Sequence, residues 1–203
     1  MMNKLLIFIG FCFFTLIAHG GVYDDILVAV QNNDSATVID LINRGMDVNT
    51  ADSAGSTLLM IAARNGNQGL VEQLIKSKAT VNHLNRYGDL ALTFAALKGQ
   101  LPIATMLLEA GAEVNPSGWT PLHYAAYGGY RELMALLIKS GAKLDSPAPN
   151  RQTALMLAAK NGHEEIVRLL IAAGANISLQ DANGKTARAL ALEKGHTDTA
   201  RWL

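Results

Sequence analysis

The amino-acid sequence predicts an all-α solenoid of about six stacked helix-pair repeats, preceded by an export signal. Three observations predict this architecture. Similar tetrapeptides begin at Thr57, Leu90, Thr120, Thr153 and Thr186, a nearly constant spacing with one shorter interval. A glycine lies nine positions after the start of each tetrapeptide, and a tight-turn dipeptide such as Gly141-Ala142 recurs at a fixed distance after the first four. Such a period is typical of proteins in which each repeat covers the apolar face of its neighbour.

The composition is that of a globular chain. The 203 residues include 17 basic and 17 acidic groups, and 50% of the residues are apolar, which excludes a disordered or collagen-like chain. The net charge of zero provides no overall attraction to nucleic acid or to an anionic membrane. Cys12 is the only cysteine and lies within residues 1–20, so the rest of the chain has no disulfide, thiolate nucleophile or cysteine zinc site.

Residues 1–20 have the features of a cleavable signal peptide. Lys4 is the only charged residue, and an apolar run extends from Leu5 to Ala18. Ala18 and Gly20 place small residues three and one before a cut after Gly20, as signal peptidases require. We therefore expect a protein exported from the cytoplasm; an uncleaved membrane anchor and a buried N-terminal helix are the alternatives.

Each repeat contains signals for two helices joined by a left-handed turn. A threonine such as Thr120 is a good helix N-cap, and Pro121 fits the first helical position. The glycine nine positions later, such as Gly129, supplies the left-handed turn before a second apolar-periodic helix. The predicted core consists of Leu59, Ala62, Leu92, Ala95, Leu122, Ala125, Leu155 and Ala158.

A less regular copy precedes the first tetrapeptide. One period backward, Asp24 falls at the threonine position, Asn33 at the first glycine position and Gly45 at the tight turn. Asparagine is the best non-glycine residue for a left-handed turn, so Asn33 is consistent with a sixth repeat.

The segments Thr120–Ala126 and Asn161–Leu170 closely resemble the ankyrin repeat, and the resemblance covers about residues 22–203. It implies antiparallel helix pairs with short β-hairpin fingers between them. The implied repeats are residues 22–51, 52–84, 85–115, 116–147, 148–180 and 181–203 of one domain, 21–203. The first and last repeats have the character of caps.

Two fingers depart from the pattern. The connection from Gly111 to Thr120 is three residues shorter than the others. Arg151 stands where the family usually has glycine, so we expect the left-handed turn to shift to Asn150. Neutral drift in loops and remodelling for a ligand both explain these departures.

The histidines do not predict a reaction. His123 lies in the Thr-Pro-Leu-His motif, which braces the turns in this family, and His163 lies at an ordinary second-helix start. No metal-binding, phosphate-binding or nucleophile motif is present in the sequence. We predict a non-enzyme without cofactor or metal; a hydrolase or small-molecule binder is the least favoured class.

Aromatic and basic residues predict a partner surface on the concave face that the resemblance implies. Tyr87 and Trp119 lie in fingers and Tyr127 at the exposed end of a first helix, whereas Phe94 and Tyr124 are assigned to the core. The predicted partner-binding residues are Tyr87, Trp119, Tyr127, Arg86, Arg151, Arg64 and Lys160. Tyrosine, tryptophan and arginine often dominate binding energy, and the cations favour an acidic partner. The alternative is that a solvated face simply tolerates scattered aromatics.

The resemblance therefore predicts a monomeric, exported and periplasmic protein-binding module that binds neither nucleic acid nor, once mature, a membrane. Exported arrays of this kind are associated with helping periplasmic enzymes such as catalases, and with neutralising toxic effectors such as phospholipases as immunity proteins. The neighbouring gene would distinguish these two roles.

Overall fold

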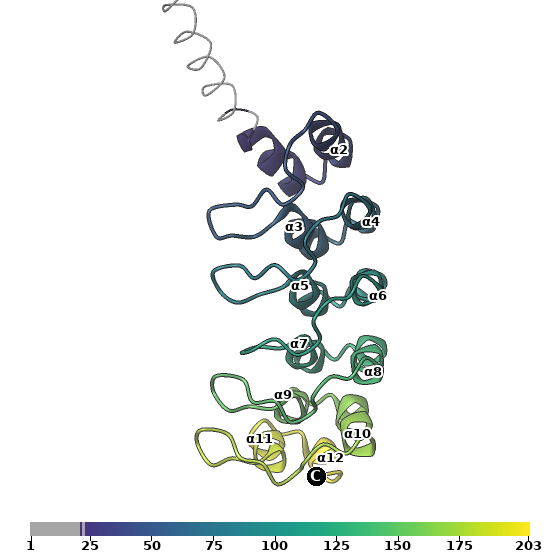
Figure 1. Cartoon of the computed structure of the whole chain (residues 1–203). Helices are drawn as coiled ribbons and strands as arrows, with labels where there is room; N and C mark the ends of the chain where they lie inside the picture. The colour runs from purple at the N-terminus through teal and green to yellow at the C-terminus, as the bar shows by residue number, and fades with distance from the viewer. Residues whose placement is uncertain (1–20, 22) are drawn as a thin grey trace, which may run out of the picture.

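The computed structural model describes residue 21 and residues 23–203, and this part of the chain forms a single file of helix pairs (Figure 1). The export signal predicted for residues 1–20 lies outside the described residues. Residues 23–31 are helical and precede α2. The helices that follow are α2 (Ser35–Asn43), α3 (Leu58–Asn65), α4 (Gln68–Lys76), α5 (Ala91–Leu97), α6 (Leu101–Glu109), α7 (Pro121–Gly128), α8 (Arg131–Lys139), α9 (Ala154–Lys160), α10 (Glu164–Ala172), α11 (Ala187–Glu193) and α12 (Thr197–Ala200).

The helices stack in two columns. The first helices α3, α5, α7, α9 and α11 pack consecutively on one another, and the second helices from α2 to α12 form the neighbouring column. The connecting loops project from the side of the first helices opposite the second helices (Figure 1). This all-helical stack confirms the predicted solenoid.

The cap predicted at the start of each first helix is present in four of five repeats. The hydroxyl of Thr57, Thr120, Thr153 or Thr186 accepts a hydrogen bond from the backbone N–H three residues later, at 3.3–3.4 Å. Leu90 has no such group. In that repeat the hydroxyl of Thr93 accepts a hydrogen bond from the backbone N–H of Leu90 at 2.6 Å. The third helical residue therefore caps the helix in place of the N-cap side chain.

The turn after each first helix is left-handed, as predicted. Its glycine has a φ of 66–79° in five repeats, and Asn33 takes the same conformation at 60° in the first. In the N-terminal repeat, the helix that contains residues 23–31 begins before Asp24, so the expectation that Asp24 occupies the cap position is wrong.

Alanine lets the first helices approach closely. The fifth residue after the N-cap is alanine in all five repeats, and each of these alanines is 0% exposed: Ala62, Ala95, Ala125, Ala158 and Ala191. All eight predicted core residues are buried, with at most 2% exposure. Apolar residues at helical spacing on the second helices complete the core, for example Leu133, Met134 and Leu137 of α8.

In the part of the chain that the structure describes, the fingers are tight-turn loops without assigned strands, so the expected β-hairpins are not confirmed. Within the described residues the only strand-like pairing is one isolated antiparallel bridge between Ala51 and Thr57. Asx turns hold the loops instead: the Asp52 carboxylate accepts the N–H groups of Ala54 and Ser56 at 2.9 and 2.8 Å. The finger before α7, which is three residues shorter, projects least (Figure 1).

Arg151 keeps the left-handed conformation itself. Its φ is 61°, close to the values of 74–83° at Gly55, Gly88, Gly118 and Gly184 in the other fingers. The prediction that the turn shifts to Asn150 is therefore wrong. The Asn150 side chain accepts the N–H of Gln152 at 3.1 Å, and the N–H of Arg151 donates to the Ala148 carbonyl at 2.7 Å. These bonds keep the turn in register, so Arg151 has to adopt a conformation that suits glycine.

Candidate interaction surface

One residue of each first helix contributes to a line of partly or fully exposed side chains across the repeats, which we call the first-helix column. It comprises the seventh residue after each N-cap: Arg64, Leu97, Tyr127, Lys160 and Glu193. Because the first helices pack consecutively, these five residues lie on consecutive repeats. None of the five is fully buried, and no two are of the same residue type.

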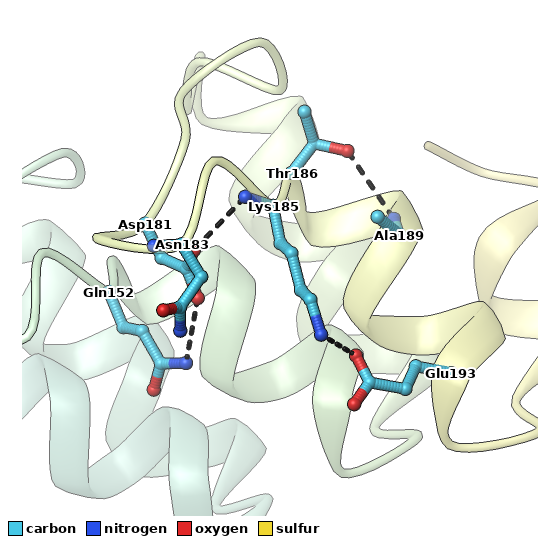
Figure 2. A network of polar contacts seen from close by, with 7 residues as sticks. All are labelled: Gln152, Asp181, Asn183, Lys185, Thr186, Ala189 and Glu193. Atoms are coloured by element: carbon cyan, nitrogen blue, oxygen red, sulfur yellow. Dashed lines mark hydrogen bonds and ion pairs between the residues drawn. The ribbon is translucent and has the colours of Figure 1, made fainter.

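The ends of the fingers share this face with the first-helix column. Lys185, the last residue of the finger before α11, extends along that helix and forms an ion pair with Glu193 at 2.5 Å (Figure 2). The hydrogen bond from Lys185 lowers the pKa of Glu193, and the same bond raises the pKa of Lys185. In the shorter finger, the Trp119 ring lies 5.6 Å from the ring of Tyr124 in α7. In these two repeats, finger and first-helix side chains therefore contact each other.

The two central repeats make the middle of this surface apolar. Leu97 is 39% exposed and Tyr127 is 56% exposed. Phe94 and Tyr124 pack against the core but remain half-buried, so the expectation that they belong to the core holds only in part. Burial, with a smaller effect of the Asp89 carboxylate, raises the pKa of Tyr124.

The backbone of Tyr127 is held in place by the next repeat. Its carbonyl oxygen accepts hydrogen bonds from Nε2 of His163 at 3.0 Å and from Nδ2 of Asn161 at 3.3 Å. A large aromatic side chain with a fixed backbone loses little conformational entropy on binding, which suits an interface anchor.

Trp119 differs from the exposed anchor that the sequence predicts. It is half-buried, packs against the core and meets the His123 ring edge-on at 5.7 Å. Only part of the indole remains available to a partner. Trp119 thus contributes to the fold as well as to the surface.

Tyr87 and Arg86 lie on the finger of residues 85–89, and both side chains are exposed, Tyr87 by 79%. The Asn85 amide oxygen accepts the N–H of Tyr87 at 2.9 Å, and the N–H of Arg86 donates to the Ala54 carbonyl of the preceding finger at 3.0 Å. The finger backbone is therefore anchored while its side chains stay in solvent.

Four cations of this surface are unpaired within the described residues, whereas Lys185 and several cations of the second helices form ion pairs. Arg64, Arg86, Arg151 and Lys160 form no ion pair with any described residue. The guanidinium of Arg64 instead lies 5.9 Å from the centre of the Phe94 ring. The second helices carry ion pairs that include Lys76–Glu72 at 2.6 Å, Arg131–Glu165 at 3.6 Å and Arg168–Glu164 at 4.0 Å.

A second surface feature was not predicted from the sequence. Trp202 donates its indole N–H to Glu164 at 3.1 Å, and the guanidinium of Arg168 lies 4.5 Å from the centre of the Trp202 ring. Trp202 and Arg168 line an open groove of about 530 Å³ beside α8 and α10. The repeat period does not indicate this contact, because it depends on the side chains of Glu164 and Arg168 in the preceding repeat.

The histidines have structural partners. Nε2 of His123 donates to the Ser146 carbonyl at 2.9 Å, and its Nδ1 accepts the N–H of Thr120 at 3.0 Å. Burial lowers the pKa of His123. The rings of His163 and His196 lie over Gly129 and Gly162 of the preceding repeats. In the described part of the chain, no three His, Cys, Asp or Glu side chains come together as a metal site would require.

The fold and this surface define a helix-pair repeat protein, and comparison with known families gives the family. The family model described as "Ankyrin repeats (3 copies)" matches residues 26–117 and 122–203, and the one described as "Ankyrin repeats (many copies)" matches residues 98–138. The chain belongs to the ankyrin-repeat family. A search of curated proteins found no match.

Ankyrin repeats generally mediate protein–protein interaction, and domains built from them are typically non-catalytic. The described residues contain no helix with the length and apolarity needed to cross a membrane.

Proposed function

We propose that this protein is an exported, non-catalytic binding module that recognises an acidic partner protein through the first-helix column and the adjacent fingers. Its role is to support or inhibit a periplasmic enzyme or effector. The observation that carries the proposal is the contrast between two positions of the same helices. The fifth residue after the N-cap is a buried alanine in every repeat, whereas the seventh differs in all five and stays accessible.

The chemistry of the first-helix column favours an acidic partner. Tyr127 and Leu97 offer apolar area at the centre, and Arg64 and Lys160 lie on the repeats that flank them, with no carboxylate paired to either among the described residues. Cations beside an exposed aromatic centre speed association with a carboxylate-rich surface and make that association sensitive to salt.

The strained backbone of Arg151 supports a role for the fingers in binding the same partner. A non-glycine residue in the left-handed region costs about 1–2 kcal/mol, and four other fingers of this chain avoid the cost with glycine. Strained residues concentrate at functional sites, so an exposed arginine at this position is explained by a contact that requires its side chain.

The test is capture of a partner from the extract of the native compartment, with the purified protein as bait. Tyr127→Ala and Arg64→Glu should each reduce recovery of the partner at least tenfold, and raising the salt concentration should reduce it further. The matched controls are Glu132→Ala and Lys139→Glu, both on the second helix α8 and outside the first-helix column. If the controls reduce recovery as much as Tyr127→Ala does, the surface assignment is wrong.

Two further measurements address location and role. An intact mass that begins at Gly21, for protein taken from the native compartment, would support export with cleavage after Gly20; a mass that includes residues 1–20 would contradict it. The activity of the captured partner, assayed with and without the protein, distinguishes support from inhibition.

A further inference from the structure

The distance between consecutive residues of the first-helix column restricts the spacing of the side chains with which a partner can contact them. Packed helices lie about 8–10 Å apart, so consecutive column residues are separated by roughly that distance. An α-helix rises about 1.5 Å per residue and returns to nearly the same face after about seven residues, or about 10.5 Å. A partner helix lying along the column therefore places one side chain of each heptad on each repeat.

An extended segment fits this surface less well. Within the described residues the chain has no strand, and the isolated bridge at Ala51 already pairs with Thr57, so no open strand edge is offered. The column consists of helix side chains, which cannot pair with the alternating N–H and C=O groups of an extended backbone. A helix satisfies its own backbone groups and presents only side chains.

The order of residues along the column then gives the pattern of the partner. Arg64 comes first, followed by the apolar pair Leu97 and Tyr127, and then by Lys160. The next residue, Glu193, is neutralised by its ion pair with Lys185 and offers nothing to a further acid. The complementary sequence has a carboxylate, two apolar side chains and a second carboxylate, each one heptad after the one before.

We propose that the partner element is an acidic amphipathic α-helix, with heptad-spaced anchors that read acid, apolar, apolar and acid from the second repeat to the fifth. This inference rests on the proposed function, because it specifies which part of the partner docks on the same surface. Three heptads, or about 21 residues of rise, span roughly 32 Å, which matches three repeat spacings of about 10 Å. The docking helix therefore has to be about 22 residues long or longer.

The test uses synthetic peptides with fluorescent labels, each of about 25 residues so that the helix covers all four anchors. The first peptide carries Glu, Leu, Leu and Glu at heptad spacing in a helix-forming background of alanine and glutamine. A second has the same composition with the anchors five positions apart, which spreads them around the helix. A third carries a central proline that breaks the helix, and a fourth has lysine at both outer anchors.

Binding of each peptide to the purified protein is measured by fluorescence anisotropy. The heptad peptide should bind at least tenfold more tightly than the other three, and Tyr127→Ala should weaken it at least tenfold. Arg64→Glu should weaken the heptad peptide and restore binding of a variant peptide with lysine at the first anchor only. The control Lys139→Glu should leave all affinities unchanged.

The proposal is overturned if the five-position spacing or the proline peptide binds as tightly as the heptad peptide. Absence of binding by the heptad peptide, or failure of the Arg64→Glu charge swap to restore affinity, also overturns it. These outcomes are separate from failure of the proposed function. If recovery of the native partner still depends on Tyr127, the surface assignment stands and only the helical docking element is wrong.

Discussion

Replacing Arg151 by glycine should make the protein more stable and its binding weaker. Arg151 has a φ of 61° at a finger position where the other four fingers have glycine. Relief of the left-handed conformation is worth about 1–2 kcal/mol, and the greater flexibility of glycine in the unfolded chain offsets about 0.5–1 kcal/mol of that gain. The expected net increase in the free energy of unfolding is therefore about 0.5–1 kcal/mol.

Lys78→Gly is the matched control for this substitution. Lys78 also has a positive φ, 68°, but it lies in the turn after α4 rather than on a finger. Lys78→Gly should increase the free energy of unfolding by a similar amount and leave binding of the captured partner unchanged. Arg151→Gly should weaken that binding about fivefold or more, because it removes a cation from the interaction surface.

Urea titration followed by far-UV circular dichroism measures the stability of each variant, and titration of the captured partner measures affinity. If Arg151→Gly leaves stability unchanged while Lys78→Gly increases it, the strain argument at the finger is wrong. If Arg151→Gly stabilises the protein without weakening binding, the strain has no functional explanation in this surface.

The packing of the repeats leads to four other predictions. Gly128→Ala should lower the free energy of unfolding by about 1–2 kcal/mol in urea titrations, because a Cβ there would clash with the Tyr130 ring. In a Tyr130→Ala background the same change should be neutral or stabilising, and a loss in both backgrounds would refute the contact. Leu122→Ala should cost about 2–5 kcal/mol, and a loss below about 1 kcal/mol would mean that the repeat register is wrong. Burial lowers the pKa of His123, so its contribution to stability is complete above pH 6.5, the ordinary value, and is lost as the pH falls through the lowered pKa. His123→Met should flatten this part of the stability–pH profile, and an unchanged profile would exclude His123 as its source. Trp202→Ala should accelerate hydrogen exchange in α12 while the central helices stay protected, because it removes the contacts that hold the C-terminal end. Equal exchange in α12 of both proteins would show that these contacts add nothing.

The repeat register could be predicted because local backbone chemistry determines it. A cap residue, a left-handed turn nine positions later and an apolar period between them each constrain the backbone of one repeat. Asn33 shows how specific these constraints are, since it takes the left-handed conformation that its register position demands. Arg151 also takes the left-handed conformation of its register position, although arginine disfavours that conformation. The hydrogen bonds of the finger fix the backbone there.

The details of the surface could not be predicted, because they depend on contacts between repeats. Whether Trp119 is exposed depends on the neighbouring rings of His123 and Tyr124, and no spacing rule gives their orientation. The pairing of cations likewise requires the distance to carboxylates on adjacent helices, as for Arg131 and Glu165. Periodicity places a residue on a face, but the side chains of the next repeat determine how much of it remains available.

The contrast between buried and accessible positions of the first helices explains how one scaffold can carry a specific surface. Close helix packing requires alanine at the fifth position after each N-cap, and any larger side chain there would push adjacent repeats apart. The seventh position lies about half a turn further on and stays accessible, so its residue changes from arginine to leucine, tyrosine, lysine and glutamate along the chain. Exposed substitutions of this kind usually alter stability by less than about 0.5 kcal/mol. Under the proposed function, recognition therefore rests on positions that folding leaves free, and substitutions within the first-helix column are expected to change the choice of partner without unfolding the protein.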